Sequence, residues 1–145
     1  MASRNGFTMV EIVVSVAIGV LLAGLASFAT VRFMKNQELD ALAGTLVSYL
    51  RTAENRALQS EGNVGHGVST AESKLTLFRG ANYANKQTSY DTTLSYPSYI
   101  TFTGLNEVDF VKHTGAPSAT GTISVTNGIK TTVITVYSSG AISKQ

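Results

Sequence analysis

The clearest pattern in the chain is an uncharged hydrophobic segment near its start. Residues 12–31 read IVVSVAIGVLLAGLASFATV, twenty positions without a charged side chain. A helix of twenty residues is about 30 Å long, which matches the hydrocarbon thickness of a bilayer. We therefore predict a hydrophobic helix over residues 7–31 that crosses a membrane once. The alternative is a buried helix of a soluble protein, but the polar remainder of the chain offers little surface to cover it.

After this segment the apolar pattern changes from continuous to periodic. Apolar residues recur at steps of three or four, which is the spacing of one face of a helix. They are Leu39, Leu42, Leu46, Leu50, Ala53 and Ala57. The helix is thus predicted to continue as an amphipathic segment over residues 32–61. Gly62 is a plausible stop, with residues 62–67 as a connection.

Beyond the helix the chain is rich in serine and threonine, which make up 24 of the 84 residues from Gly62 onward. Short alternating runs, typical of half-buried strands, appear in this part. They lie at 74–78, 99–102, 108–111, 122–126 and 131–137. Asn127 and Gly128 separate the last two runs and are a strong hairpin signal. Residues 80–98 are expected to form a long loop with tyrosines.

Together these patterns predict an α+β fold. A long N-terminal α-helix, transmembrane in its first half and amphipathic in its second, would pack against a C-terminal antiparallel β-sheet head. The head would comprise residues 62–145. Ile123 and Val125 should face the helix, because they alternate with polar residues in their run.

Composition and charge argue against most catalytic chemistry. The chain of 145 residues has no cysteine, two histidines and a net charge of +2. Disulfide scaffolds and thiolate metal sites are therefore excluded. His66 and His113 lie far apart in the sequence and are both expected on the surface or in loops. Glu107 and Asp109 would share one strand face, but two carboxylates are few for calcium. We expect no enzyme, no cofactor and no metal.

A motif stands immediately before the hydrophobic segment. It reads Gly6-Phe7-Thr8-Met9-Val10-Glu11 and follows a short polar leader, residues 1–6. This arrangement resembles the N-terminal signature of type IV pilins and type II secretion pseudopilins. The resemblance implies that a prepilin peptidase cuts between Gly6 and Phe7 and that the new amine of Phe7 is methylated. It also implies that Glu11 meets the terminal amine of a neighbouring subunit and sets its alignment in a filament.

The same resemblance implies locations and partners. The prepilin would be held in the cytoplasmic (inner) membrane by a single helix, with its head outside the cytoplasm. It would then enter an extracellular or periplasmic filament. Its partners would be the lipid bilayer, the prepilin peptidase and methylase, an assembly platform membrane protein, and other pilin or pseudopilin subunits.

A second resemblance lies in the head. Phe110, Gly115-Ala116-Pro117, Gly121-Thr122-Ile123 and the run VITVYSSGAI are similar to the head of H-type minor pseudopilins and related minor pilins. The alternative function is therefore that of a minor pilin that binds DNA during uptake or adheres to a surface. Against DNA, the six basic residues of the head are scattered among four acidic ones. A surface that follows phosphates needs a clustered basic stripe.

Overall fold

The computed structural model describes residues 6–145, apart from the side chains of residues 25–29. The chain divides into two compact units, of which the first ends at Lys35 and the second is Asn36–Gln145. Helix α1, Met9–Leu58, contributes to both units. It has no proline in its interior, and proline is the strongest helix breaker. The predicted long N-terminal helix is confirmed, with ends a few residues inside the expected ones.

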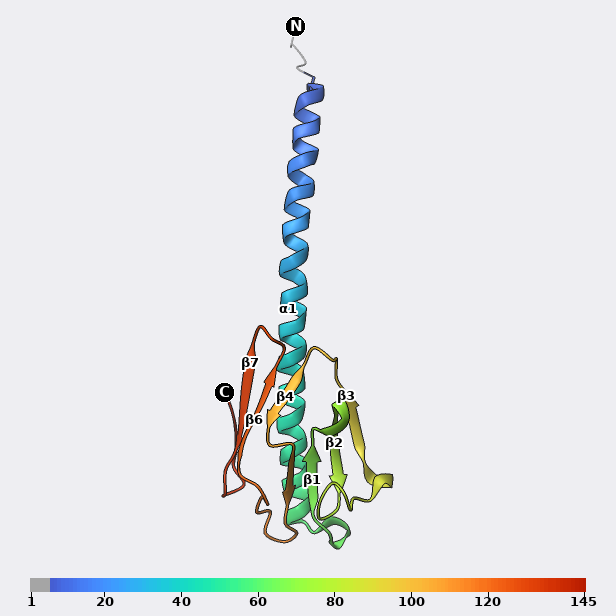
Figure 1. The fold of residues 1–145 in the computed structure, drawn as a ribbon, viewed down its shortest axis with the longest axis vertical. Helices are drawn as coiled ribbons and strands as arrows, with labels where there is room; N and C mark the ends of the chain where they lie inside the picture. The colour runs from blue at the N-terminus through green and yellow to red at the C-terminus, as the bar shows by residue number, and fades with distance from the viewer. Residues whose placement is uncertain (1–5) are drawn as a thin grey trace. The chain divides into compact units, whose positions relative to one another are not determined.

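The head consists of eight strands within the described residues (Figure 1). One four-stranded sheet has the order β3-β2-β1-β5, and the other has the order β4-β6-β7-β8. Every pairing between neighbouring strands is antiparallel. The strands are β1 His66–Ser69, β2 Lys74–Arg79, β3 Thr92–Ser95, β4 Thr101–Gly104, β5 Glu107–Phe110, β6 Gly121–Thr126, β7 Thr131–Val136 and β8 Ile142–Lys144. The predicted α+β class with an antiparallel head is thus confirmed.

The core of the head forms between these sheets and the predicted apolar stripe of α1. All six stripe residues are buried, with at most 5% of their surface exposed. They join one hydrophobic cluster with strand residues from both sheets. Burying a large apolar side chain contributes about 1.5–3 kcal/mol. The stripe is therefore the main reason that the sheets stay on the helix.

The predicted hairpin joins β6 and β7. Thr126 pairs with Thr131, and the backbone N–H groups of Ile129 and Lys130 donate to the Asn127 side-chain oxygen at 3.0 and 2.8 Å. Gly128 has φ 80°, a conformation that glycine adopts without strain. Ile123 and Val125 are buried as predicted, and so are Ile134 and Val136 of β7.

Three strands were not predicted from the sequence. Strand β1 begins in the expected connection and extends two residues beyond it, β3 lies in the expected loop 80–98, and β8 follows the last predicted run. All four residues of β1 are buried, so the strand shows no alternation. Gly67 is needed there, because an added Cβ would stand 2.4 Å from the Phe78 ring. The expectation of a surface position was wrong for His66, which is 1% exposed, whereas His113 is exposed in a turn.

Candidate processing and assembly site

Gly6 and Phe7 precede the first turn of α1. Their backbone is not helical, and Phe7 is 78% exposed. A Cβ added to Gly6 would meet nothing within 4 Å, so the bond between the two residues is open on the side of the glycine. Exposed, non-helical backbone of this kind is what a peptidase needs to bind. The rest of the predicted leader, residues 1–5, lies outside the described residues.

Thr8 caps the N-terminus of α1. Its side-chain oxygen accepts a hydrogen bond of 3.2 Å from the backbone N–H of Glu11, and its carbonyl accepts one of 3.2 Å from the N–H of Ile12. A threonine followed three residues later by glutamate is the capping-box pattern. Our interpretation of the sequence assigned no role to Thr8, although the pattern stands in front of the apolar run and could have revealed it.

The carboxylate of Glu11 is exposed in the first turn of this helix. The unpaired N–H groups there carry partial positive charge, which favours an acidic side chain. Among the described residues Glu11 forms no ion pair. Within the described residues, its carboxylate is thus available to a cation from another molecule.

Apolar side chains of the first unit are exposed on all sides of α1. Three consecutive residues, such as 12–14 or 20–22, point in three different directions around a helix, and all are exposed by half or more. A helix that is hydrophobic all round belongs in a membrane or a large assembly. The exposed set is Met9, Val10, Ile12, Val13, Val14, Val16, Ile18, Val20, Leu21, Leu22, Val31, Phe33 and Met34.

The predicted membrane-spanning segment 7–31 includes residues 25–29, whose side chains lie outside the described set. A search of the described residues finds no helix with both the length and the apolar character that a membrane crossing requires. The crossing therefore stays a prediction.

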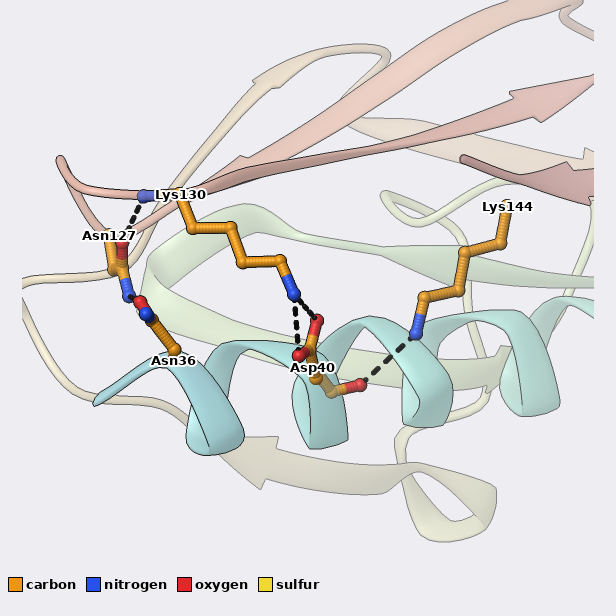
Figure 2. A network of polar contacts seen from close by, with 5 residues as sticks. All are labelled: Asn36, Asp40, Asn127, Lys130 and Lys144. Carbon is orange, nitrogen blue, oxygen red and sulfur yellow. Dashed lines mark hydrogen bonds and ion pairs between the residues drawn. The ribbon is translucent and has the colours of Figure 1, made fainter. Parts of the chain in front are cut away.

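A network of polar contacts joins the β6–β7 hairpin and strand β8 to the part of α1 that lies in the second unit, Asn36–Gln145 (Figure 2). Lys130 Nζ donates to both carboxylate oxygens of Asp40, at 2.7 and 2.6 Å. Asn127 Nδ2 donates to Asn36 Oδ1 at 3.0 Å, and Lys144 Nζ donates to the Asp40 carbonyl at 3.4 Å. The side chains of Lys130 and Asp40 are each 43% exposed, so their ion pair adds little stability. The ion pair joins the hairpin to the helix at Asp40.

Three of the six basic side chains of the head have acidic residues as their partners. Lys130 and Lys144 are engaged with Asp40, as described above. Lys86 pairs with Asp91, and this hydrogen bond raises the pKa of the Lys86 ammonium group. A phosphate-tracking surface would need such cations to be aligned and available.

The two acidic residues of β5 each accept a hydrogen bond from a nearby segment of the head. Glu107 Oε1 accepts a hydrogen bond of 2.5 Å from the backbone N–H of Tyr83, and Asp109 Oδ1 accepts one of 2.5 Å from Ser118 Oγ. In the described part of the chain, no three side chains of the metal-binding kinds come together. Each carboxylate therefore has a hydrogen-bond partner within the head.

The comparisons with known proteins bear on the N-terminus alone. The family model of the prokaryotic N-terminal methylation motif matches residues 1–27. No curated protein and no solved structure matches the chain, so the resemblance of the head to H-type minor pseudopilins stays a prediction. The matched range includes Gly6, Phe7 and Glu11. Residues 1–27 thus carry the N-terminal methylation motif of type IV pilin-like prepilins.

Proposed function

We propose that this protein is a structural subunit of a type IV pilus-like filament or a type II secretion pseudopilus. It is anchored in the membrane as a prepilin, cleaved between Gly6 and Phe7, methylated on Phe7 and polymerised through α1. The observation that carries the proposal is the methylation motif directly in front of a helix with apolar side chains exposed all round.

The exposed apolar side chains of α1 drive this helix out of water. Each large apolar side chain that leaves water contributes about 1.5–3 kcal/mol, so this helix is unstable in water on its own. A bilayer covers it before assembly, and helices of sister subunits cover it afterwards. Because lipid is as apolar as the helix, the exchange between the two needs little free energy. The alignment of each subunit with its neighbours in the filament must then come from polar groups.

Glu11 is the polar group that supplies the alignment. Cleavage creates a positive amine on Phe7, one residue before the Thr8 cap. Two unit charges 4 Å apart attract by about 4 kcal/mol at an effective dielectric constant of about 20. A carboxylate buried without a partner is strongly unfavourable, so a filament register that leaves Glu11 unpaired is disfavoured.

The alternative is a minor pilin whose head binds DNA or a surface. It has less support, because two of the six basic side chains of the head, Lys86 and Lys130, form ion pairs with acidic neighbours. The likeness to H-type minor pseudopilins would place the subunit among the minor components of a secretion pseudopilus, and the same filament chemistry applies there.

Mass spectrometry of the N-terminus tests the proposal in the native host. We expect a chain that begins at Phe7 and carries one methyl group, present in both the membrane fraction and a sheared surface or periplasmic fraction. A chain that still begins at Met1 and never leaves the membrane would overturn the proposal.

A pair of variants tests the role of Glu11. Glu11→Gln and Glu11→Ala should insert and be cleaved normally but should be absent from the sheared filament fraction. Glu54→Gln, which removes a carboxylate from the head end of the same helix, is the matched control and should assemble. Normal filaments from Glu11→Ala would remove this role.

A further inference from the structure

Strand β3 ends one of the two sheets and has a free edge. It pairs with β2 on one side, and no other described strand pairs with it on the other. Its residues Thr92–Ser95 are all exposed and uncharged. Backbone N–H and C=O groups alternate toward the free side of such a strand, which makes it a template for a further strand.

The other terminal strands are protected or lack an adjoining cavity. Strand β5 carries Glu107 and Asp109, and the following segment covers it: Ser118 N–H donates to the Asp109 carbonyl at 2.8 Å. Strand β8 has three residues and includes Lys144. Charges, short length and covering loops are the usual protections of sheet edges. Strand β4 is uncharged, but it does not line the cavity next to α1 that β3 lines.

A cavity of about 170 Å³ lies between α1 and the end of β3, together with the residues that follow this strand. Ala41, Leu42 and Thr45 line it from the helix, and Leu94 and Tyr96 line it from the strand and the residues that follow. Since one water occupies about 30 Å³ of liquid, the cavity has room for a side chain. A strand added to β3 would send alternate side chains toward this cavity.

One charged residue, Glu38, lines the same cavity. It is exposed, and its carboxylate accepts a hydrogen bond from the Tyr99 hydroxyl. That hydrogen bond raises the pKa of the Tyr99 phenol. A carboxylate at an apolar opening attracts a basic group and disfavours an acidic one.

From this arrangement we propose that β3 and the adjoining cavity bind an extended segment of a partner polypeptide. The segment adds to β3 as a further strand, inserts one apolar side chain between Leu94 and Leu42, and places a lysine or arginine near Glu38. Backbone hydrogen bonds supply the affinity, and the cavity and Glu38 supply the selectivity, as in other cases of strand addition.

A second copy of this chain fits the edge less well than a different polypeptide. Strand β3 runs along the head part of α1 (Figure 1), so antiparallel pairing of two β3 strands would reverse one helix relative to the other. A filament whose subunits all point the same way excludes that arrangement; this step alone rests on the proposed function. Two copies would also bring two Glu38 carboxylates to one interface, which is unfavourable.

Hydrogen exchange with the full chain in detergent micelles tests the proposal. The probe is a short peptide of alternating valine and threonine with one lysine, and its matched form has glutamate in place of the lysine. We expect the lysine peptide to slow exchange at Thr92–Ser95. The glutamate peptide should bind about tenfold more weakly, because it faces Glu38 with a like charge.

Two variants sharpen the test. Leu94→Lys should weaken binding of the lysine peptide about tenfold or more, because a lysine on the edge strand opposes strand addition. Ser143→Lys on β8 is the matched control and should bind as the wild type does. Glu38→Gln should remove the preference for lysine over glutamate, and it keeps the test valid if Leu94→Lys does not fold.

Three results would overturn the proposal. The first is unchanged hydrogen exchange at Thr92–Ser95 when the lysine peptide is added, and the second is equal binding of that peptide by the Leu94→Lys and Ser143→Lys variants. The third is self-association of the wild type that Leu94→Lys abolishes, because this would identify a second copy as the occupant. None of these variants touches Gly6, Phe7 or Glu11. Cleavage and filament assembly can therefore succeed whether or not β3 binds a peptide.

Discussion

The side-chain oxygen of Thr8 accepts a hydrogen bond of 3.2 Å from the backbone N–H of Glu11. The residue that caps α1 thus holds the turn that carries the proposed assembly carboxylate. If the first turn were frayed, the backbone of Glu11 could adopt many positions. The cap holds that backbone in the helical position. We infer that Thr8 contributes to alignment through the helix cap.

Replacement of Thr8 by alanine should therefore loosen the first turn. Loss of a threonine N-cap costs about 0.5–2 kcal/mol of helix stability. Amide exchange at Glu11 and Ile12 should become faster by the corresponding factor, as measured by mass spectrometry or NMR in micelles. Thr8→Ser keeps a side-chain acceptor and should exchange nearly as the wild type does. Equal exchange in all three proteins would contradict the capping role.

The ion pair between Asp40 and Lys130 should give a small but measurable coupling. A double-mutant cycle of Asp40→Asn and Lys130→Met is expected to yield about 0.2–1 kcal/mol from urea unfolding, because both partners are about half exposed. Salt should reduce the coupling, since exposed charges are screened. A coupling of zero at low salt would show that the contact only accompanies the docking of the hairpin.

Periodicity explains which parts of the fold could be predicted. The stripe from Leu39 to Ala57 and the β6–β7 hairpin alternate between buried and exposed positions at the period of their own element. Burial in β1 is continuous and exposure in β3 is continuous, so neither strand has a period to detect. Both are placed by pairing with β2, which is a tertiary contact.

The same reasoning applies to the sites. Gly6, Phe7 and Glu11 form a local motif, so the sequence alone locates them. The cavity beside β3 combines Leu42 with Leu94, which are far apart in the chain and meet only in the folded head. No local pattern in the sequence could have predicted that cavity.

The stripe itself gives a stability prediction. Leu46 is 0% exposed and lies in the hydrophobic cluster. Leu46→Ala should lower the free energy of unfolding of the head by about 2–5 kcal/mol, because it removes buried methyl groups and leaves a cavity. Ser48→Ala, on the exposed face of the same turn, should change it by less than about 0.5 kcal/mol. Thermal or urea unfolding of the two variants side by side measures the difference.

His66 gives a pH prediction. It is 1% exposed, and within the described residues neither ring nitrogen has a hydrogen-bond partner. Burial lowers the pKa of its imidazole below the ordinary 6.5; Glu61 opposes this shift, while Arg56 and Arg79 add to it. The folded head therefore holds His66 neutral at a pH where the unfolded chain would already bind a proton.

The sign of the effect follows from this difference in proton binding. Well above pH 6.5 His66 is neutral in both states, and its full contribution to stability is present. As the pH falls through 6.5, the unfolded chain takes up the proton first, and stability declines until the folded pKa is passed. Urea midpoints measured from about pH 8 to about pH 5 should show this decline in the wild type, in the range where histidine titrates. His66→Phe should flatten it, and His113→Asn, at an exposed turn that accepts positive φ, should keep it. Identical slopes in the wild type and His66→Phe would assign the pH dependence to other groups.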